Sequence, residues 1–186
     1  MSENIYERLV VKRVTNEASW VTVLGGSIMP PEVLQAMVDA TPCFVEMPEL
    51  NKKAGEVIAR MTGAEAGQVV SGASAGQVLM VASCMTGSSE AKAAQLADTR
   101  GLKDEVVIQR CQRNRYDGAF LIPGARLVEI GKSNTTPSWE LESAINEKTA
   151  CVAYIFAPFH RYPLSLKEVV EIAHHHEVPV IVDAAA

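Results

Sequence analysis

A short run of small and hydroxyl-bearing residues, Ser71-Gly72-Ala73-Ser74-Ala75-Gly76, has the composition of an anion-binding loop. It stands between a predicted strand, 68–70, and a predicted helix, 77–85. Glycine lets backbone N–H groups turn toward an anion, a helix start favours negative charge, and the Ser74 hydroxyl can donate a hydrogen bond. No lysine follows Gly76, so the run is neither a Walker motif nor GxGxxG, which disfavours ATP and dinucleotides. A phosphate cup and a tight turn without a ligand both fit this spacing.

A second candidate is Asp183, which ends the apolar run 178–182 and is followed by three alanines. A carboxylate at the C-terminal end of a parallel strand lies where α/β sheets bind ligands. The alanines leave room for a flat group to approach. The alternative is a helix N-cap aspartate, which is the commoner role for such a residue taken alone.

Together the two features suit a ligand with a phosphate at one end and a basic ring nitrogen at the other. Pyridoxal 5'-phosphate has both groups. The cup would hold its phosphate, and the carboxylate would keep its pyridine nitrogen protonated. A protonated ring is the electron sink that stabilises a carbanion at the α-carbon of a substrate.

The elements that would position these groups alternate between strands and helices. Strands are expected at 68–70, 106–108, 126–130, 150–156 and 178–182, and helices from Pro30, over 54–61, 77–85 and 138–145, and after a Ser165/Glu168 capping box. Continuously apolar strands between helices indicate a parallel sheet covered on both faces. The predicted fold class is therefore α/β, with residues 1–65 as a helical N-terminal segment and 66–186 as the cofactor-binding domain.

Composition limits the possible partners and compartments. The chain has 186 residues, of which 48% are hydrophobic and 21% charged, as in an ordinary soluble domain. A net charge of −5 with scattered basic residues argues against a broad nucleic-acid surface. Four separated cysteines without a CxxC pair indicate a reducing compartment, and no run approaches the ~20 apolar residues of a membrane span. We therefore expect a cytoplasmic protein with a small-molecule substrate and neither a nucleic-acid nor a membrane partner.

Three smaller features have two interpretations each. Arg110, Arg113 and Arg115 form a local basic cluster that could bind a substrate carboxylate or phosphate, or could be an ordinary charged surface. His160 follows the fourth predicted strand and either faces the site or lies in a solvated loop. The run His174–His176 resembles a metal cluster, but consecutive helical residues point about 100° apart, so no metal site is expected.

Four blocks of the sequence, spread between about Thr15 and the last residue, form a recognisable series. They are Leu24–Val33, Ser71–Gly76, Gly101–Arg110 and Val180–Ala186. In order and spacing they resemble the bacterial family related to selenocysteine synthase, L-seryl-tRNA selenium transferase. That family includes D-glucosaminate-6-phosphate ammonia-lyase-like enzymes and belongs to the fold-type-I, aspartate-aminotransferase-like pyridoxal phosphate enzymes.

The resemblance implies roles for the matching positions. The cofactor would be bound by Ser71, Gly72, Ala73, Ser74, Gln112 and Asp183. The candidate substrate ligands, which come from the basic cluster and the loop after the fourth strand, are Arg113, Arg115 and His160. Of the cofactor ligands, the first four would lie at the phosphate and Asp183 at the pyridinium nitrogen. Gln112 would lie over the ring, where many relatives carry a histidine. Glutamine can lie against a ring but cannot titrate near neutral pH.

The resemblance also implies a lysine that holds the cofactor as a Schiff base and follows the aspartate by a few tens of residues. All eight lysines of this chain precede Asp183, and two family strands have no counterpart. We therefore expect an N-terminal portion of a pyridoxal-phosphate-dependent lyase or transferase for a small amino acid or amino sugar acid, homodimeric or larger when complete. The alternatives are a non-catalytic remnant or binding module, and an L-seryl-tRNA selenium transferase.

Overall fold

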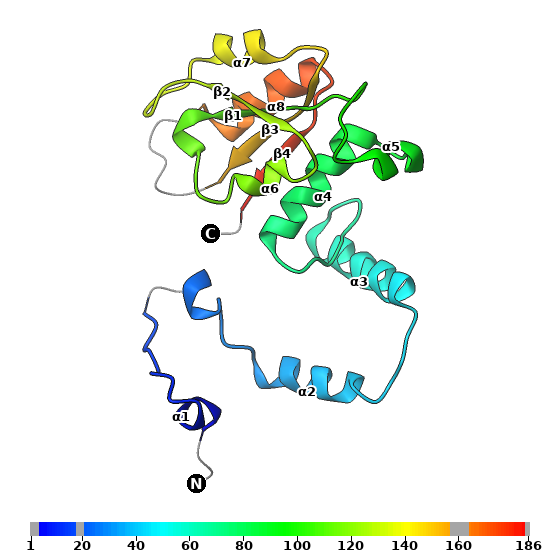
Figure 1. Ribbon diagram of the computed structural model, residues 1–186, viewed down its shortest axis with the longest axis vertical. Helices are drawn as coiled ribbons and strands as arrows, with labels where there is room; N and C mark the ends of the chain where they lie inside the picture. Colours follow the sequence, from blue (N-terminus) through cyan, green and yellow to red (C-terminus); the bar gives the residue numbers. More distant parts are fainter. Residues whose placement is uncertain (1–3, 18–20, 157–163, 185–186) are drawn as a thin grey trace. The chain divides into compact units, whose positions relative to one another are not determined.

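The computed structural model describes residues 4–17, 21–156 and 164–184. The chain divides within helix α3 (Met47–Thr62) into two compact units, Met1–Asn51 and Lys52–Ala186. The sequence suggests a later boundary, at residue 65. Figure 1 draws both units with their element labels.

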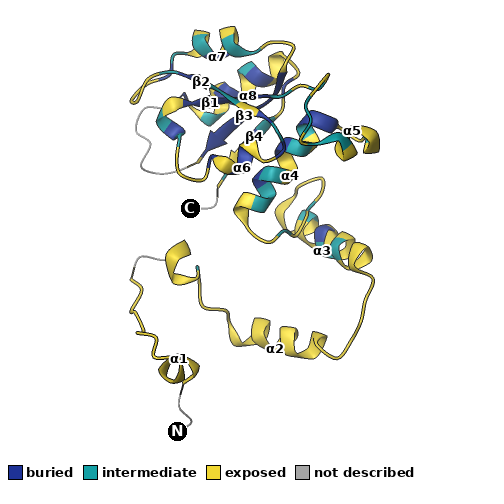
Figure 2. Ribbon diagram, viewed as in Figure 1, coloured by how far each residue is buried: buried dark blue, intermediate teal, exposed yellow. Residues whose placement is uncertain are grey.

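The first unit consists of short helices with exposed apolar side chains. It holds α1 (Ile5–Arg8), the 3-10 turn η1 (Thr22–Leu24), α2 (Pro31–Ala40) and the start of α3. Helix α2 begins where the sequence predicts, because Pro31 at its first position has a backbone angle already suited to a helix. None of the described residues of this unit is buried (Figure 2).

The second unit is built on a parallel sheet, as the sequence predicts. Its described strands are β1 (Glu105–Gln109), β2 (Arg126–Ile130), β3 (Thr149–Ile155) and β4 (Val180–Asp183). They are all parallel and lie in the order β2-β1-β3-β4. The α/β class is thus confirmed, with strand ends within two residues of those expected.

Helices cover both faces of this sheet. They are α4 (Ala73–Thr86), α5 (Glu90–Gln95), α6 (Gly118–Leu121), α7 (Ser138–Ala144) and α8 (Leu166–His175), with the 3-10 turn η2 (Arg110–Gln112) after β1. Helices α4 and α6 pack on the face that carries Val106 and Ile108, and α7 and α8 on the face that carries Val107 (Figure 1). Every residue of β1 and β3 is therefore buried (Figure 2).

The capping box predicted at the start of α8 is present. The Glu168 N–H donates to Ser165 Oγ (3.3 Å), and the Ser165 N–H donates to the Glu168 carboxylate (3.1 Å). These bonds satisfy two backbone donors at the helix start. Val169 and Ala173, one turn apart, are buried against the sheet, as the helical spacing predicts.

The prediction of a strand at 68–70 is wrong. Residues 68–70 are not part of a strand, and Val69 is half exposed. The segment is instead held close to α3. A Cβ built on Gly55 would lie 2.1 Å from the Gly67 carbonyl oxygen, and one on Gly67 would lie 2.8 Å from Ile58 Cβ. Two glycines thus allow a backbone contact that keeps the segment on the helix instead of beside a strand.

Helix α4 differs from its prediction in burial. The sequence is apolar on nearly every face and predicts a helix buried all round, ended by Gly87. Gly87 is its C-cap, as expected. However, the buried residues are Gln77, Val81 and Met85, which recur every four positions, together with Thr86 at the end of the helix, whereas Leu79 and Met80 are exposed. The helix therefore presents one face to the sheet and its neighbours.

Along the described residues, no helix is both long and apolar enough to cross a membrane.

Candidate functional site

The two predicted ligand groups are linked through helix α4. Asp183 is the last residue of β4, at the carboxyl edge of the sheet. Gln77 lies in the second turn of α4, and its Nε2 donates to Asp183 Oδ2 at 2.6 Å. Helix α4 starts at the predicted cup. The hydrogen bond therefore places the cup and the carboxylate on the same edge, where parallel sheets bind ligands.

The predicted cup is an open helix start. Gly72 is the N-cap of α4, with φ 139°, a backbone angle that favours glycine. No side chain caps the first turn, and Ser71 to Ser74 are exposed. The first N–H groups of a helix have no acceptor within the helix, so they remain available to an anion beside the Ser74 hydroxyl.

Gln77 is buried, with 3% of its surface exposed. Its Oε1 has no hydrogen-bond partner among the described residues, although its Nε2 is bound to Asp183. The side chain is thus half satisfied in a buried position, which costs free energy. Our sequence analysis did not single out Gln77. The available signal was a lone amide within the apolar residues of α4.

Gln112, the predicted ring contact, is fully buried instead of facing an open site. Its Nε2 donates to the Ile155 carbonyl (3.2 Å), and its Oε1 accepts from the Ile155 N–H (3.2 Å). The amide therefore binds the end of β3 as a neighbouring strand would. In this structure the side chain has no surface left with which to lie against a ring.

Gln109, at the end of β1, makes a similar double contact. Its Oε1 accepts from the Leu164 N–H (2.6 Å), and its Nε2 donates to the Leu164 carbonyl (3.2 Å). Gln109 and Gln112 thus hold residues 164 and 155, which flank the segment that carries His160. His160 itself, a predicted substrate ligand, lies outside the described residues.

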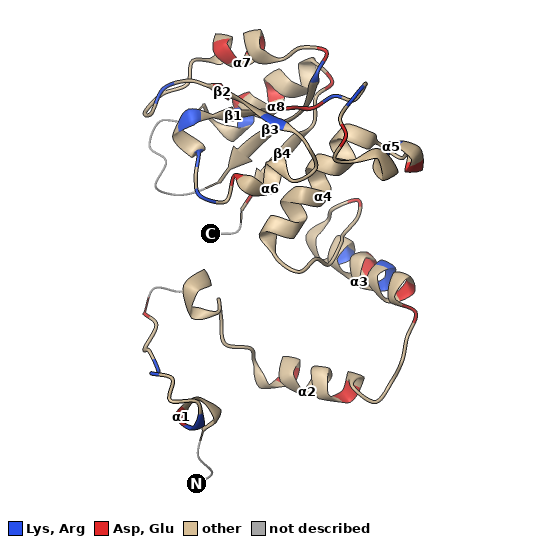
Figure 3. Ribbon diagram, in the orientation of Figure 1, with Lys and Arg blue, Asp and Glu red and all other residues tan. Residues whose placement is uncertain are grey.

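The basic cluster after β1 lies on ribbon that Figure 3 colours blue, and its contacts separate it into two kinds of arginine. Arg113 pairs with Asp117 and Glu129, and Arg110 pairs with Glu129 at 3.0 Å. The hydrogen bond that the Arg113 guanidinium donates to Asp117, helped by the negative charges of Asp117 and Glu129, raises the pKa of that guanidinium. Arg113 is therefore already neutralised by carboxylates.

Arg115 has a different environment. It is exposed, donates to the Tyr116 hydroxyl at 2.7 Å, and lies 4.9 Å from the centre of that ring. These contacts leave its charge uncompensated by the carboxylates that hold Arg113. Of the two predicted substrate ligands on this segment, Arg115 is the better placed for an anion.

The histidine run lies at the end of α8. His174 and His175 occupy its last turn, and His176 is its C-cap. Within the described ranges, no group of three or more His, Cys, Asp or Glu side chains is arranged to hold a metal ion. At the end of a helix, these side chains suit the negative end of its dipole.

Solved structures define the class of fold. The chain resembles alanine aminotransferase from Pyrococcus furiosus with a TM-score of 0.54 and 19% identity, covering 84% of this chain and 41% of that one. It resembles aspartate aminotransferase from Thermus thermophilus with a TM-score of 0.55 and 16% identity, covering 83% and 44%. The fold is thus aspartate-aminotransferase-like.

Closer relatives define the family. D-glucosaminate-6-phosphate ammonia lyase from Salmonella typhimurium is 41% identical over 192 residues, covering 100% of this chain and 52% of the relative. A solved D-glucosaminate-6-phosphate ammonia-lyase matches with a TM-score of 0.94. A Streptomyces 5'-C-glycyluridine monooxygenase-decarboxylase is 36% identical, covering 97% and 47%. The chain thus spans about half the length of the curated relatives it matches.

The family model of SelA, L-seryl-tRNA selenium transferase, matches residues 20–186. The chain belongs to this family, and the resemblance found in the sequence is confirmed.

Proposed function

We propose that this chain forms the phosphate-binding and ring-nitrogen-binding part of a pyridoxal 5'-phosphate site. The observation that carries the proposal is the bond from Gln77 to Asp183, since it joins the helix behind the cup to the carboxylate at the end of β4. The membership of the family and the aminotransferase-like fold support the same cofactor.

The residues present fit this group chemically. The uncapped start of α4 and the hydroxyls of Ser71 and Ser74 would hold the phosphate. The Asp183 carboxylate would accept a hydrogen bond from the protonated ring nitrogen. When bound, the cofactor supplies a sink for the electrons of a bond broken at the α-carbon of a substrate. Gly72 keeps the cup backbone in an angle that few other residues adopt. Ala184, exposed beyond Asp183, leaves space beside the ring.

The proposed reaction is elimination from a small amino acid or amino sugar acid, with release of ammonia. Its support is the 41% identity to an enzyme named D-glucosaminate-6-phosphate ammonia lyase over the whole of this chain. The proposed substrate ligand is Arg115, because its exposed guanidinium suits a carboxylate or phosphate. Arg113 would act by holding its own segment through Asp117 and Glu129. His160 stays a proposed ligand from the sequence alone.

A selenium transferase is the second candidate. An L-seryl-tRNA(Sec) selenium transferase from Actinobacillus pleuropneumoniae is 32% identical, but only over 69% of this chain. The higher identity to the ammonia lyase, together with the net charge of −5, favours the small substrate. We also propose a homodimer or larger assembly, which the exposed apolar side chains of α2 support.

The test uses the protein expressed from its complete gene. Pyridoxal phosphate is titrated in and followed by its absorbance, and ammonia release is then measured with phosphorylated amino sugar acids and with serine. We expect saturable cofactor binding, weakened in Asp183→Asn and unchanged in Asp98→Asn, a carboxylate paired with Arg100 on the surface. Absence of binding at millimolar cofactor would overturn the site. Binding without ammonia from any amino acid would overturn the elimination.

A further inference from the structure

We propose that Gln77 is a positioning residue for the Asp183 carboxylate, and that α4 thereby sets the separation between the two ends of the cofactor site. The inference rests on the proposed function, because it concerns the same site. It adds a residue that is neither in the cup nor at the ring, and that acts through Asp183.

The geometry of the bond supports this role. Gln77 reaches Asp183 across 106 positions of sequence, with Nε2 and Oδ2 only 2.6 Å apart. Helix α4 packs against both β3 and β4, so its second turn is fixed beside the strand end. A hydrogen bond to a charged acceptor is stronger than one between neutral groups, and a buried one is better shielded from water.

The orphaned oxygen of Gln77 supports the role independently. Turning the amide round would place its carbonyl against the Asp183 carboxylate, so the charge on Asp183 fixes the orientation in which Oε1 lacks a described partner. A buried acceptor without a partner destabilises the fold, and an apolar side chain of equal length would avoid that cost. The packing of α4 does not require an amide at this position. The role of Gln77 is therefore to donate a hydrogen bond to Asp183.

Helix α4 then connects the two anchor points. Gly72 begins the helix and Gln77 follows five residues later. At 1.5 Å per residue, this separates the backbone of Gly72 from that of Gln77 by roughly 7.5 Å along the axis. Because a helix is stiff, the carboxylate bound to Gln77 is held at a set distance from the phosphate donors.

The variants are Gln77→Met, which keeps the length and removes the donor, and Gln77→Glu, which places a second carboxylate against Asp183. The matched control is Gln35→Met. Gln35 also donates its Nε2 to an aspartate, Asp39, at 2.8 Å, but on an exposed helix face. Three quantities are measured in the protein from its complete gene: the Kd for pyridoxal phosphate, the pH dependence of cofactor absorbance at saturation, and the Tm without cofactor.

For Gln77→Met we expect a Kd raised about tenfold to a hundredfold and a displaced pH profile, with only a small change in Tm, because the lost bond to Asp183 is offset by removal of the orphaned Oε1. Gln77→Glu is expected to weaken binding further, and Gln35→Met to match the wild type. An unchanged pH profile at saturating cofactor in both Gln77 variants would overturn the inference, whatever happens to the Tm. Failure of the wild type to bind cofactor would instead overturn the proposed function.

Discussion

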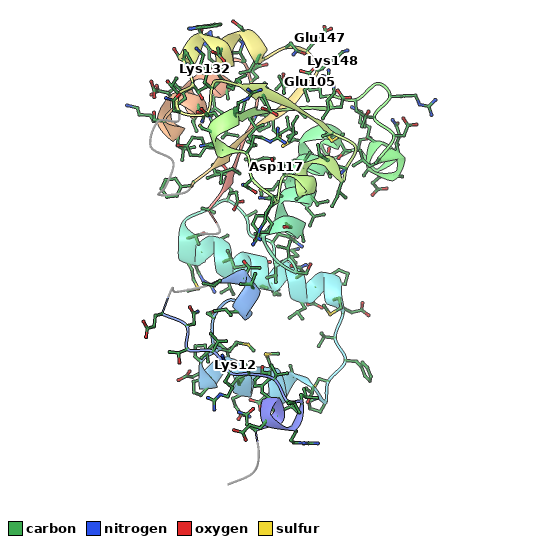
Figure 4. The ribbon with its side chains drawn as sticks, turned by 60° about the vertical axis from the view of Figure 1, so that its left-hand side comes forward. Lys12, Glu105, Asp117, Lys132, Glu147 and Lys148 are labelled. Carbon is green, nitrogen blue, oxygen red and sulfur yellow. The ribbon has the colours of Figure 1, made fainter. Side chains whose placement is uncertain are left out.

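The two edges of the sheet differ in how fully their buried polar side chains are hydrogen-bonded. At the amino edge, buried Glu105 is bound by the Arg126 guanidinium and by Asn146 Nδ2 at 2.7 Å. At the carboxyl edge, Asp117 is likewise paired, with Arg113, but three buried polar groups are neutral amides, and one of them, Gln77, has an Oε1 without a described partner. Figure 4 labels Glu105 at the first edge and Asp117 at the second. A closed network indicates a structural role, whereas unused hydrogen-bonding capacity indicates a place for a ligand.

The carboxyl edge is itself divided. Gln109 and Gln112 use both ends of their amides on backbone groups, as a strand would. Gln77 uses one end, and on a carboxylate. The same residue type therefore serves the fold in two positions and, as we propose, the cofactor in the third.

The largest effect on stability is expected for Gln112→Leu. This change leaves the buried N–H and carbonyl of Ile155 without their side-chain partner, and each such group costs free energy. We expect a loss of about 3 kcal/mol in the free energy of unfolding, measured with urea. Gln35→Leu, on an exposed surface, is the control. A loss as small as in the control would show that the buried amide is not a structural clamp.

At the amino edge, Glu105→Gln should lower the free energy of unfolding by about 2 kcal/mol, because it removes the charge that Arg126 faces. Cofactor binding should be unchanged, since the substitution lies at the opposite end of β1 from Gln109. Unfolding in urea and a cofactor titration check both parts. A changed Kd in the folded variant would contradict the division between the two edges.

A smaller loss of stability is expected for Gly72→Ala. Nothing lies within 4 Å of the added Cβ, so the cost comes from the backbone angle alone, about 1 kcal/mol. Because the strain falls on the cup, cofactor affinity should fall as well. Gly118→Ala is the control, because its added Cβ also meets nothing and its backbone angle is ordinary. Equal changes in stability and in cofactor affinity for the two variants would show that the backbone angle of Gly72 has no particular role in the cup.

The smallest effects separate the two arginines. Arg113→Met should lower the free energy of unfolding by about 1 kcal/mol, discounted for solvent screening, since Asp117 and Glu129 lose their partner. Arg115→Met should leave stability unchanged and raise the KM for an anionic substrate severalfold. Thermal unfolding and steady-state kinetics check the pair. A loss of stability in Arg115→Met together with a raised KM in Arg113→Met would contradict these assignments and make Arg113 the substrate ligand.

The sequence predicts the sheet well, because continuously apolar strands indicate burial on both faces wherever their partners lie. It fails at 68–70, where two apolar residues after Gln68 are too few to distinguish a strand from a segment held on α3 by Gly55 and Gly67. It also fails for the exposed face of α4. An apolar helix does not show which of its sides will meet a neighbour.

The candidate site is predicted to the level of residue types. Asp183 and the cup follow from composition and position at the ends of elements. Their link through Gln77 does not, because it spans 106 residues. The neutralisation of Arg113 likewise depends on Glu129, which the pairing of β2 with β1 brings opposite Ile108. Such contacts can be predicted only when the order of the strands in the sheet is known.

The sequence separation of Gln77 and Asp183 also has a consequence in time. The two residues are 106 positions apart, and at about 5–20 residues per second the ribosome needs about 5 to 20 s to pass from the first to the second. During this interval the nascent chain already contains the cup but not the carboxylate. Any cofactor that requires both anchors must therefore be acquired after β4 has been synthesised, however early α4 folds.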